Sequence, residues 1–373
     1  MDLTVRRQQL LAAMDARGDW PGGAPWVREA ITALPRDLFA PDTLWHWDGH
    51  RWTPLQRGRD EDAWAGELYG SQDRAAVTQL LDGLPSSSIS SQGVVASMLG
   101  ALRLEPGHRV GEAGTGSGLN TALLARRAGP DTVVSVEVDQ HLAEHARHRL
   151  ARHHAGAAVL TADADPWPGG EAGLDRFIAT YAVDRVPWSW ITALRPAGRL
   201  VFPWGHLGHA ALTVADDHRS ATGPLIGLAQ FMPARARLTT RRTYDELRRT
   251  VPEESETEHR LDLAPLRTHP ALLLHLRVVL PEVTVTTGVD EDGTSAWAHD
   301  GRASWAALSA FGGGQVAFVQ GGPRRLADEI HDAVQAWYGL GEPGVGDYGI
   351  TVLADEQYAW CRDPLTGPRW PQP

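Results

Sequence analysis

The fold of this chain follows from one stretch, Val110-Gly111-Glu112-Ala113-Gly114-Thr115-Gly116-Ser117-Gly118. Its last three glycines alternate after a short apolar run, and glycine lets a backbone loop approach a flat ligand closely. The run that ends at Arg109-Val110 predicts an incoming strand, and Asn120–Arg127 predicts the outgoing helix. A strand, a glycine loop and a helix in this order predict a ligand site at the edge of a parallel sheet.

An acidic residue follows the glycine loop at the spacing that is typical of nucleoside-binding sites. A second apolar strand, 132–136, ends at Glu137, which comes 19 residues after Gly118. In dinucleotide-binding proteins an acid about 20 residues on accepts hydrogen bonds from the ribose. The spacing here is Gly-x-Gly-x-Gly, and Glu112 would repel a pyrophosphate but suit a cationic amino-acid group. S-adenosylmethionine has that group and no phosphate, so the sequence predicts it as the ligand.

Three other interpretations of these residues are weaker. The loop alone could be a glycine-rich turn without a ligand, but Glu137 argues against that. A serine-hydrolase loop of the type Gly-x-Ser-x-Gly needs serine at its centre, where residue 116 is glycine. His141, His145 and His148 have the spacing of metal ligands on one helix, but no acid or thiolate completes the pattern. No metal is therefore expected.

Composition narrows the class of protein. The chain has 373 residues and a formal net charge of −11, which argues against nucleic acid as a partner because phosphate binding needs a basic surface. The single cysteine, Cys361, rules out an internal disulfide. Neither a signal peptide nor a long apolar run is present, so a soluble cytoplasmic protein without membrane contact is expected.

Strands that alternate with helices predict the α/β class, a parallel sheet covered on both faces. Further strands are predicted over 157–162, 175–180 and 198–202. The serine-rich segment Leu84–Gly93 is predicted as a polar, turn-rich approach to a helix over 94–102.

We expect three parts in the chain. These are an N-terminal helical and hairpin extension (1–85), an S-adenosylmethionine-binding domain of Rossmann-like topology (86–235) and a C-terminal α+β domain (236–373). The last part is rich in tryptophan, tyrosine and arginine, which suits either substrate recognition or oligomerisation, with a homodimer as the assembly considered.

Over roughly residues 20–205 the chain resembles the L-isoaspartyl protein carboxyl methyltransferases. Five segments are similar to family motifs in the same order: Ser88-Ile89-Ser90, Glu112–Gly118, Glu137, Ala162-Asp163-Ala164 and Pro196–Gly205. Three departures stand out: both glycines of the adenine-binding turn are alanines here, Ser91-Gln92-Gly93 replaces a Gln-Pro pair, and the chain continues long after the usual end.

The resemblance implies a Rossmann-like fold, S-adenosylmethionine as cofactor and a peptide or protein substrate that carries aspartate or isoaspartate. It implies a role in catalysis for Ser90, with weaker claims for Ser88 and Ser91. A hydroxyl there can hold one carboxylate oxygen while the other faces the methyl group, although these serines could also cap the following helix. The residues implied to contact the cofactor are Glu112, Gly114, Thr115, Gly116, Gly118, Glu137, Val138, Asp163 and Ala164. Tyr181 and Arg185 are the candidates for contact with substrate. Arg185 follows the fourth predicted strand at the edge where open sheets bind ligands, so it could recognise substrate carboxylates, although it could equally be a solvated surface arginine.

Four segments resemble a subgroup of methyltransferases that accompany ribosomally made peptides: Tyr69–Gln79, Ile178–Pro187, Phe231–Pro233 and Gln320–Arg325. The subgroup implies methylation of an aspartate side chain in a modified peptide, followed by cyclisation to an aspartimide and, in some cases, opening to isoaspartate. General repair of isoaspartate in proteins is the first alternative, against which the C-terminal extension argues. A non-catalytic peptide-binding protein that keeps the fold is the second.

Overall fold

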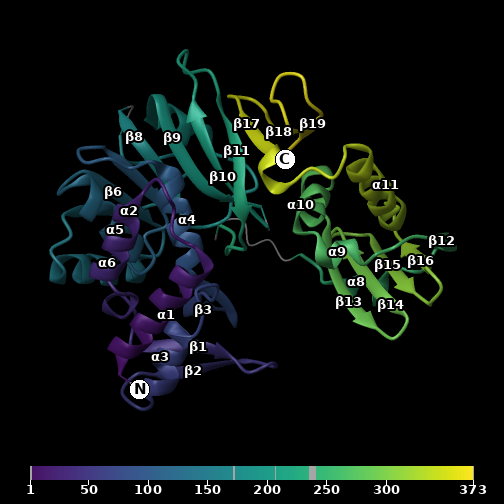
Figure 1. Cartoon of the computed structure of the whole chain (residues 1–373), viewed down its shortest axis with the longest axis horizontal. Coiled ribbons are helices and arrows are strands. Elements are labelled where there is room, and N and C mark those ends of the chain that lie inside the picture. Colours follow the sequence, from purple (N-terminus) through teal and green to yellow (C-terminus); the bar gives the residue numbers. More distant parts are fainter. Residues whose placement is uncertain (1, 171–172, 206, 235–240, 373) are drawn as a thin grey trace.

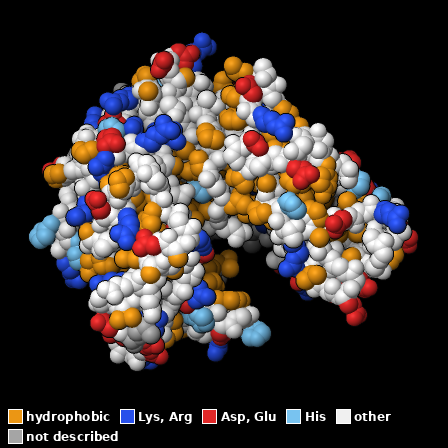
Figure 2. Space-filling view, viewed as in Figure 1, with side chains coloured by type: hydrophobic (Ala, Val, Ile, Leu, Met, Phe, Trp, Pro, Cys, Tyr) orange, Lys and Arg blue, Asp and Glu red, His pale blue; other side chains and the backbone are white. Residues whose placement is uncertain are grey.

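The protein has two lobes joined at one end (Figure 1). The structure, a computed structural model, describes residues 2–170, 173–205, 207–234 and 241–372. The larger lobe holds the N-terminal half and the long central sheet, and the smaller lobe holds most of the chain after residue 241. In the space-filling view the molecule is hollowed between the lobes, and basic and acidic side chains are interspersed on this face (Figure 2).

The central sheet combines a parallel and an antiparallel half. Within the described residues its strand order is β19-β18-β17-β11-β10-β9-β8-β5-β6-β7. The parallel half consists of β5 (Val110–Ala113), β6 (Val133–Glu137), β7 (Ala157–Thr161), β8 (Leu174–Ala179) and β9 (Leu194–Trp204). The antiparallel half adds β10 (Gly208–Val214), β11 (Ala221–Leu228), β17 (Tyr348–Val352), β18 (Gln357–Cys361) and β19 (Arg369–Pro371).

Helices cover both faces of this sheet, as its apolar strands require. Neighbouring residues of β9 point to opposite cores, since Val201 belongs to one apolar cluster and Phe202 to the other. The first cluster includes α1 (Leu3–Arg17), α2 (Pro25–Ala33), α4 (Gln92–Leu102), α5 (Leu119–Ala128) and α6 (Gln140–Arg152), and the second includes α7 (Trp188–Ala193). The α/β fold class is thus the one expected, and no helix in the described part of the chain is long and apolar enough to cross a membrane.

A small antiparallel sheet lies beside the parallel half of the central sheet in the larger lobe. Its order is β2-β1-β3-β4, so β4 is an edge strand. Its elements are β1 (Thr43–Trp47), β2 (Trp52–Gln56), α3 (Glu61–Tyr69), β3 (Ala76–Leu81) and β4 (Leu84–Ile89), with the 3-10 turn η1 (Arg36–Leu38) before them. The predicted turn-rich segment is therefore partly wrong, because 84–89 pairs with β3. Ser87 and Ile89 point inward with a period of two, a strand pattern that the serine-rich composition hides.

The smaller lobe is built on an antiparallel sheet of order β12-β16-β15-β14-β13. Its strands are β12 (Ser255–Arg260), β13 (Thr284–Asp290), β14 (Gly293–His299), β15 (Trp305–Ala310) and β16 (Gln315–Gly321). Its helices are α8 (Tyr244–Thr250), α9 (Pro265–Thr268), α10 (Pro270–Val279) and α11 (Leu326–Gly339), and the 3-10 turn η3 (Val345–Asp347) leads back to the larger lobe.

Helix α10 joins the two lobes because both of its faces are buried. Leu272 and Leu276 belong to the core of the smaller lobe. Leu274 and Val278 belong to the core under the central sheet. Each pair is four residues apart, the spacing that places side chains on one face of a helix. The helix is thus a shared wall between two cores.

The structure departs from the predicted division of the chain at its C-terminal end. Strand β17 pairs with β11, and β18 and β19 follow it outward, so these strands belong to the central sheet and not to the sheet of the smaller lobe (Figure 1). The last strands of the predicted domain 236–373 therefore extend the central sheet. Local sequence patterns identify short strands but not their distant partners. Strands β10 and β11 are absent from the sequence prediction, and the predicted boundary at 235–236 lies outside the described residues.

Candidate active site

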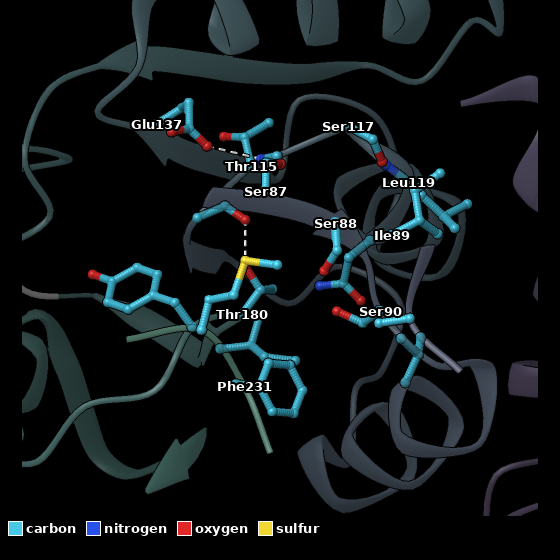
Figure 3. A pocket seen from close by; sticks show the side chains of 18 of the residues that line it. Ser87, Ser88, Ile89, Ser90, Thr115, Ser117, Leu119, Glu137, Thr180 and Phe231 are labelled. Atoms are coloured by element: carbon cyan, nitrogen blue, oxygen red, sulfur yellow. Dashed lines mark hydrogen bonds between the residues drawn. The ribbon is translucent and has the colours of Figure 1, made fainter. Parts of the chain in front are cut away.

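A cavity of about 450 Å³ opens at the carboxyl ends of β5, β6 and β8. Strand β5 lies between β6 and β8, so the direction of chain crossing reverses there, and open parallel sheets bind ligands at such a point. The volume falls in the range of roughly 300–1,000 Å³ that is typical of small-molecule sites. In Figure 3, Glu137 and Thr115 lie on one side of this cavity, and Ser88 and Ser90 lie on another.

The glycine loop that follows β5 has the conformation that its composition predicts. Gly114, Gly116 and Gly118 all have positive φ, at 92°, 54° and 88°. A Cβ atom at Gly114 would lie 2.5 Å from Thr180 Oγ1, so the loop packs directly on the segment after β8. A Cβ atom at Gly116 would have Ser87 Oγ, across the cavity lining, as its nearest neighbour at 3.8 Å. All three positions favour glycine because of the backbone angle, and Gly114 also needs it for space.

Glu137 is held in place at the end of β6 and lines the cavity. The backbone N–H of Gly116 donates to its Oε2 (2.8 Å), and that of Asp139 donates to its Oε1 (3.1 Å). Each carboxylate oxygen can accept two hydrogen bonds. Since each of these oxygens accepts one here, both keep capacity for a ribose hydroxyl. The side chain is oriented before any ligand arrives, as a binding group should be.

The expected adenine end also lies on the cavity. Asp163 and Ala164 follow β7, and Val138 follows β6. The indole N–H of Trp190 donates to the carbonyl of Ala164 (2.8 Å), which fixes this turn although alanine stands where the family has glycine. A carboxylate, small side chains and the apolar neighbours of this turn suit a flat nucleoside, and the residues present therefore fit the nucleoside of S-adenosylmethionine.

Gly118, although predicted to contact the cofactor, does not line the cavity. Glu112 is the second such exception among the predicted cofactor residues. It lies inside β5 and is fully buried, and it does not line the cavity. Its carboxyl group accepts hydrogen bonds from Asn120 Nδ2 (2.7 Å), Ser135 Oγ (2.6 Å) and the hydroxyl of Thr121. Burial raises its pKa to about 7, against the lowering by these three donors. The prediction of a direct contact is wrong because β5 begins at Val110, where the sequence analysis ends it, and this places Glu112 behind the loop.

Thr115 is buried beneath the loop, and its hydroxyl is hydrogen-bonded to Ser135 Oγ (2.6 Å). Ser135 therefore contacts both Thr115 and Glu112 and ties β6 to the loop. Sequence reasoning missed Ser135, because a serine in the middle of a buried strand carries no signal of its partners.

The three predicted serines, Ser88, Ser90 and Ser91, all line the cavity. Ser91 is the N-cap residue of α4, but its side chain makes no capping hydrogen bond, and Ser90 precedes the cap. The cap interpretation thus has no hydrogen bond to support it, whereas the cavity position agrees with contact to an acceptor. Ser86 and Ser87 also line the cavity and were not predicted.

The two predicted substrate residues separate in the structure. Tyr181 lines the cavity, next to Thr180. Arg185 does not, and lies instead on a second hollow of about 140 Å³ beside β17 and β18, where it donates to the carbonyl of Asp355 (3.3 Å). Its proposed place at the site is wrong because the loop after β8 turns away toward the C-terminal strands.

One wall of the cavity escaped prediction as a site. Residues 228–234 follow β11 and line it, with Phe231 near Thr180 in Figure 3. Ala182 lies beside this wall, since its backbone N–H donates to the carbonyl of Met232 (2.8 Å). Their sequence resemblance to a subgroup was the available signal. The three histidines of α6 are exposed, and no group of side chains suited to a metal occurs among the described residues.

The doubly covered parallel sheet, the glycine loop and the acid at the end of β6 define the class of S-adenosylmethionine-dependent methyltransferases. Comparison with known families gives the particular one. The family model described as protein-L-isoaspartate(D-aspartate) O-methyltransferase matches residues 23–223, more than half of the chain. The chain belongs to this family; it is an S-adenosylmethionine-dependent carboxyl O-methyltransferase.

Individual relatives agree with this assignment. Protein-L-isoaspartate O-methyltransferase 2 of Rhodopseudomonas palustris (strain HaA2) is 38% identical over 152 residues, which cover 39% of this chain and 68% of the relative. The enzyme of that family from Ignicoccus hospitalis is 34% identical over 179 residues, 48% of this chain and 72% of the relative. A solved structure of a protein-L-isoaspartate O-methyltransferase has a TM-score of 0.53 and 19% identity, and covers 96% of this chain and 100% of its own.

Proposed function

We propose that this enzyme transfers a methyl group to the free carboxylate of L-isoaspartyl residues in proteins. The observation that carries the proposal is the placement of the serine segment on the same cavity as the glycine loop and Glu137. The family match and the names of the relatives support isoaspartate as the acceptor.

The residues of the cavity divide the work between two ends. Glu137 accepts hydrogen bonds from the ribose, and Asp163 and Ala164 receive the adenine. When bound, S-adenosylmethionine supplies a methyl group on a cationic sulfur. At the other end, the hydroxyl of Ser90 donates to one oxygen of the acceptor carboxylate and leaves the second oxygen to attack in line. A charge-assisted hydrogen bond of this kind contributes about 1.5–3 kcal/mol.

Proton transfer is not needed for this reaction. A carboxylate is already ionised at neutral pH, because its pKa lies near 4. The chain therefore has to align and desolvate the acceptor, and alignment alone can contribute several kcal/mol to catalysis. The apolar wall of 228–234 is suited to the second task, since it excludes water from the acceptor end.

A pair of peptides tests the proposal. The two peptides share one sequence and differ only in whether a single residue is L-aspartyl or L-isoaspartyl. Transfer of a labelled methyl group to the isoaspartyl peptide alone is expected, and a third peptide with the carboxylate replaced by a carboxamide serves as the blank. Equal methylation of both acidic peptides would contradict isoaspartate specificity.

A narrower substrate is the second candidate: an aspartate in a modified, ribosomally made peptide, with the ester then closing to an aspartimide. One observation favours it. Of the four segments that resemble this subgroup, three contribute to the cavity, through Asp73, Tyr181 and Phe231–Pro233. The segments cluster where the acceptor would bind, which is where a change of substrate would require change.

The C-terminal extension does not by itself favour the narrower substrate. The solved isoaspartate methyltransferase that covers 96% of this chain shares the overall fold along its length. The predicted peptide anchors in this region are also largely structural, because Trp305, Trp337 and Trp360 are buried. Mass spectrometry of the enzyme with a crosslinked peptide and with its linear precursor separates the candidates. Methyl ester and dehydrated product from the crosslinked form alone would support the narrower substrate, and preference for any isoaspartyl peptide would contradict it.

A further inference from the structure

The segment Ser86–Ser91 forms one wall of the cavity, here called the serine wall, and Arg36 lies directly behind it. It is in η1 and is 2% exposed. Its guanidinium group donates to the backbone carbonyls of Ile89 (2.9 Å), Ser90 (3.0 Å) and Arg74 (3.4 Å), and to that of Leu68. One buried side chain thus connects the end of α3, the turn before β3 and the end of β4.

The charge of Arg36 has no acidic partner. No ion pair of Arg36 with a carboxylate occurs among the described residues, although most buried arginines are paired. The adjacent acid, Asp37, is engaged elsewhere, by Arg7 and by the hydroxyl of Tyr69. Four carbonyl dipoles therefore solvate a full positive charge in the interior, and Nε has no hydrogen-bond partner there.

No cationic side chain occurs among the described residues that line the cavity in front of Arg36. Its described lining includes the acids Asp73, Glu137 and Asp163, and no arginine or histidine. The proposed acceptor is nevertheless an anion, which a lining of acids alone would repel. A buried charge is weakly screened, so Arg36 acts across the single layer of backbone at Ile89 and Ser90.

We propose that Arg36 is a positioning residue that fixes the serine wall and supplies the positive charge by which the cavity selects an anionic acceptor. The inference rests on the proposed carboxylate methylation. Because peptide units are planar and trans, binding of the Ile89 and Ser90 carbonyls turns the N–H groups of Ser90 and Ser91 to the side opposite Arg36. The planar guanidinium group, with its fixed fork of N–H donors, orients two consecutive peptide groups, those of Ile89 and Ser90. The single ammonium group of a lysine would orient them less well.

Two substitutions separate the charge from the fork. Arg36→Met removes both, and Arg36→Lys keeps the charge. The measurement is the ratio of dissociation constants for an isoaspartyl peptide and its neutral carboxamide analogue, with S-adenosylhomocysteine present. We expect wild type to bind the charged peptide at least about tenfold more tightly, Arg36→Met to lower that ratio to threefold or less, and Arg36→Lys to keep it while kcat falls about tenfold.

Arg199 provides a matched control. It is a partly buried arginine whose guanidinium also donates to a backbone carbonyl, that of Ala101, and burial lowers the pKa of both arginines to about 10. It does not line the cavity. Arg199→Met should cost stability and leave the binding ratio unchanged, which separates a lost buried hydrogen bond from a lost charge at the site.

The outcomes are distinguishable. Should wild type methylate no isoaspartyl peptide, the proposed function is wrong and the role of Arg36 with it. Should wild type methylate it while folded Arg36→Met keeps the wild-type ratio, the charge does not select the acceptor and the role of Arg36 alone is wrong; an unchanged kcat in Arg36→Lys contradicts the role of the guanidinium geometry. If Arg36→Met does not fold, Arg36→Lys decides: loss of the ratio contradicts the charge, and an undiminished kcat contradicts the fork.

Discussion

The two ends of the cavity are built in different ways. The cofactor end takes Gly114–Ser117, Glu137 and Asp163 from the ends of three neighbouring strands, β5, β6 and β7, which follow one another in the chain. The acceptor end takes Ser86–Ser91 from the edge of a separate sheet and 228–234 from beyond the antiparallel strand β11. The first end is fixed by local geometry, whereas the second depends on contacts between distant segments.

Cofactor affinity and acceptor selectivity can therefore change independently of each other. Substitutions at the cofactor end should alter S-adenosylmethionine affinity, because the ligand groups there are set by the sheet itself. Substitutions at the acceptor end should alter turnover and acceptor choice while cofactor affinity stays constant.

Gly114→Ala should weaken S-adenosylmethionine binding by about a hundredfold or more. The added Cβ would lie 2.5 Å from Thr180 Oγ1 at a φ of 92°, so the loop must move. Steric and backbone strain together cost a few kcal/mol. Calorimetric titration measures the change, and Gly107→Ala is the control because it has a φ of 82° but nothing within 4 Å of its Cβ. Equal losses of affinity in the two variants would show that the close packing of Gly114 is irrelevant.

Glu137→Ala should weaken S-adenosylmethionine binding by roughly tenfold or more, the loss of about 1.4 kcal/mol or beyond that follows removal of a charge-assisted contact. Glu144→Ala, on the exposed side of α6, is the control and should change nothing. Unchanged affinity in Glu137→Ala would remove Glu137 from the cofactor end.

Ser90→Ala should lower kcat about tenfold while cofactor affinity and melting temperature stay near their wild-type values. The reason is the lost hydrogen bond to the acceptor carboxylate. Methyl transfer to an isoaspartyl peptide is measured beside calorimetry, with Ser88→Ala and Ser91→Ala compared in the same assay. A variant that loses cofactor affinity in parallel with turnover would break the separation of the two ends.

Glu112→Gln should have the smallest effect on the site, with cofactor affinity changed by less than about threefold. Its effect is on stability. The folded pKa of about 7 exceeds the usual 4.3, so the folded state binds more protons between these values, and stability falls as pH rises through this window. Removal of the titrating group should flatten that decline, which amounts to about 4 kcal/mol once the pH exceeds 7. Chemical unfolding between pH 5 and 8 measures the slope, and an unchanged slope would contradict the assigned pKa.

The residues expected at the cofactor end could be named from the sequence because their signals are local. Gly114, Gly116 and Gly118 mark the loop, and Glu137 ends a strand at the expected distance. Glu112 shows the limit of such reasoning. Strand β5 extends over Val110–Ala113 and so includes Glu112, which is therefore a buried residue of the strand and not a cofactor contact. The sequence pattern identified an acidic residue beside the glycine loop, but not the side of the loop to which its carboxyl group points.

The acceptor end resisted prediction because it is assembled over long distances in the chain. The serines were found through resemblance, but their strand β4, the wall at 228–234 and the clamp by Arg36 were not. Arg36 donates to the carbonyls of Ile89 and Ser90, more than fifty residues away in the chain. Backbone carbonyls are present at every position, so no sequence pattern indicates which ones a buried arginine will bind.

The return of the chain to the central sheet has a consequence for synthesis. Strand β11 gains its second neighbour only when β17 pairs with it. Between the end of β11 at Leu228 and the start of β17 at Tyr348 lie 119 residues. Until the ribosome has released the C-terminal segment, β11 presents an open edge, and open strand edges invite pairing with other chains. A nascent chain of this protein thus carries an adhesive edge through a third of its translation, and a message cut short before β17 would yield a polypeptide that aggregates or is degraded rather than a smaller working enzyme.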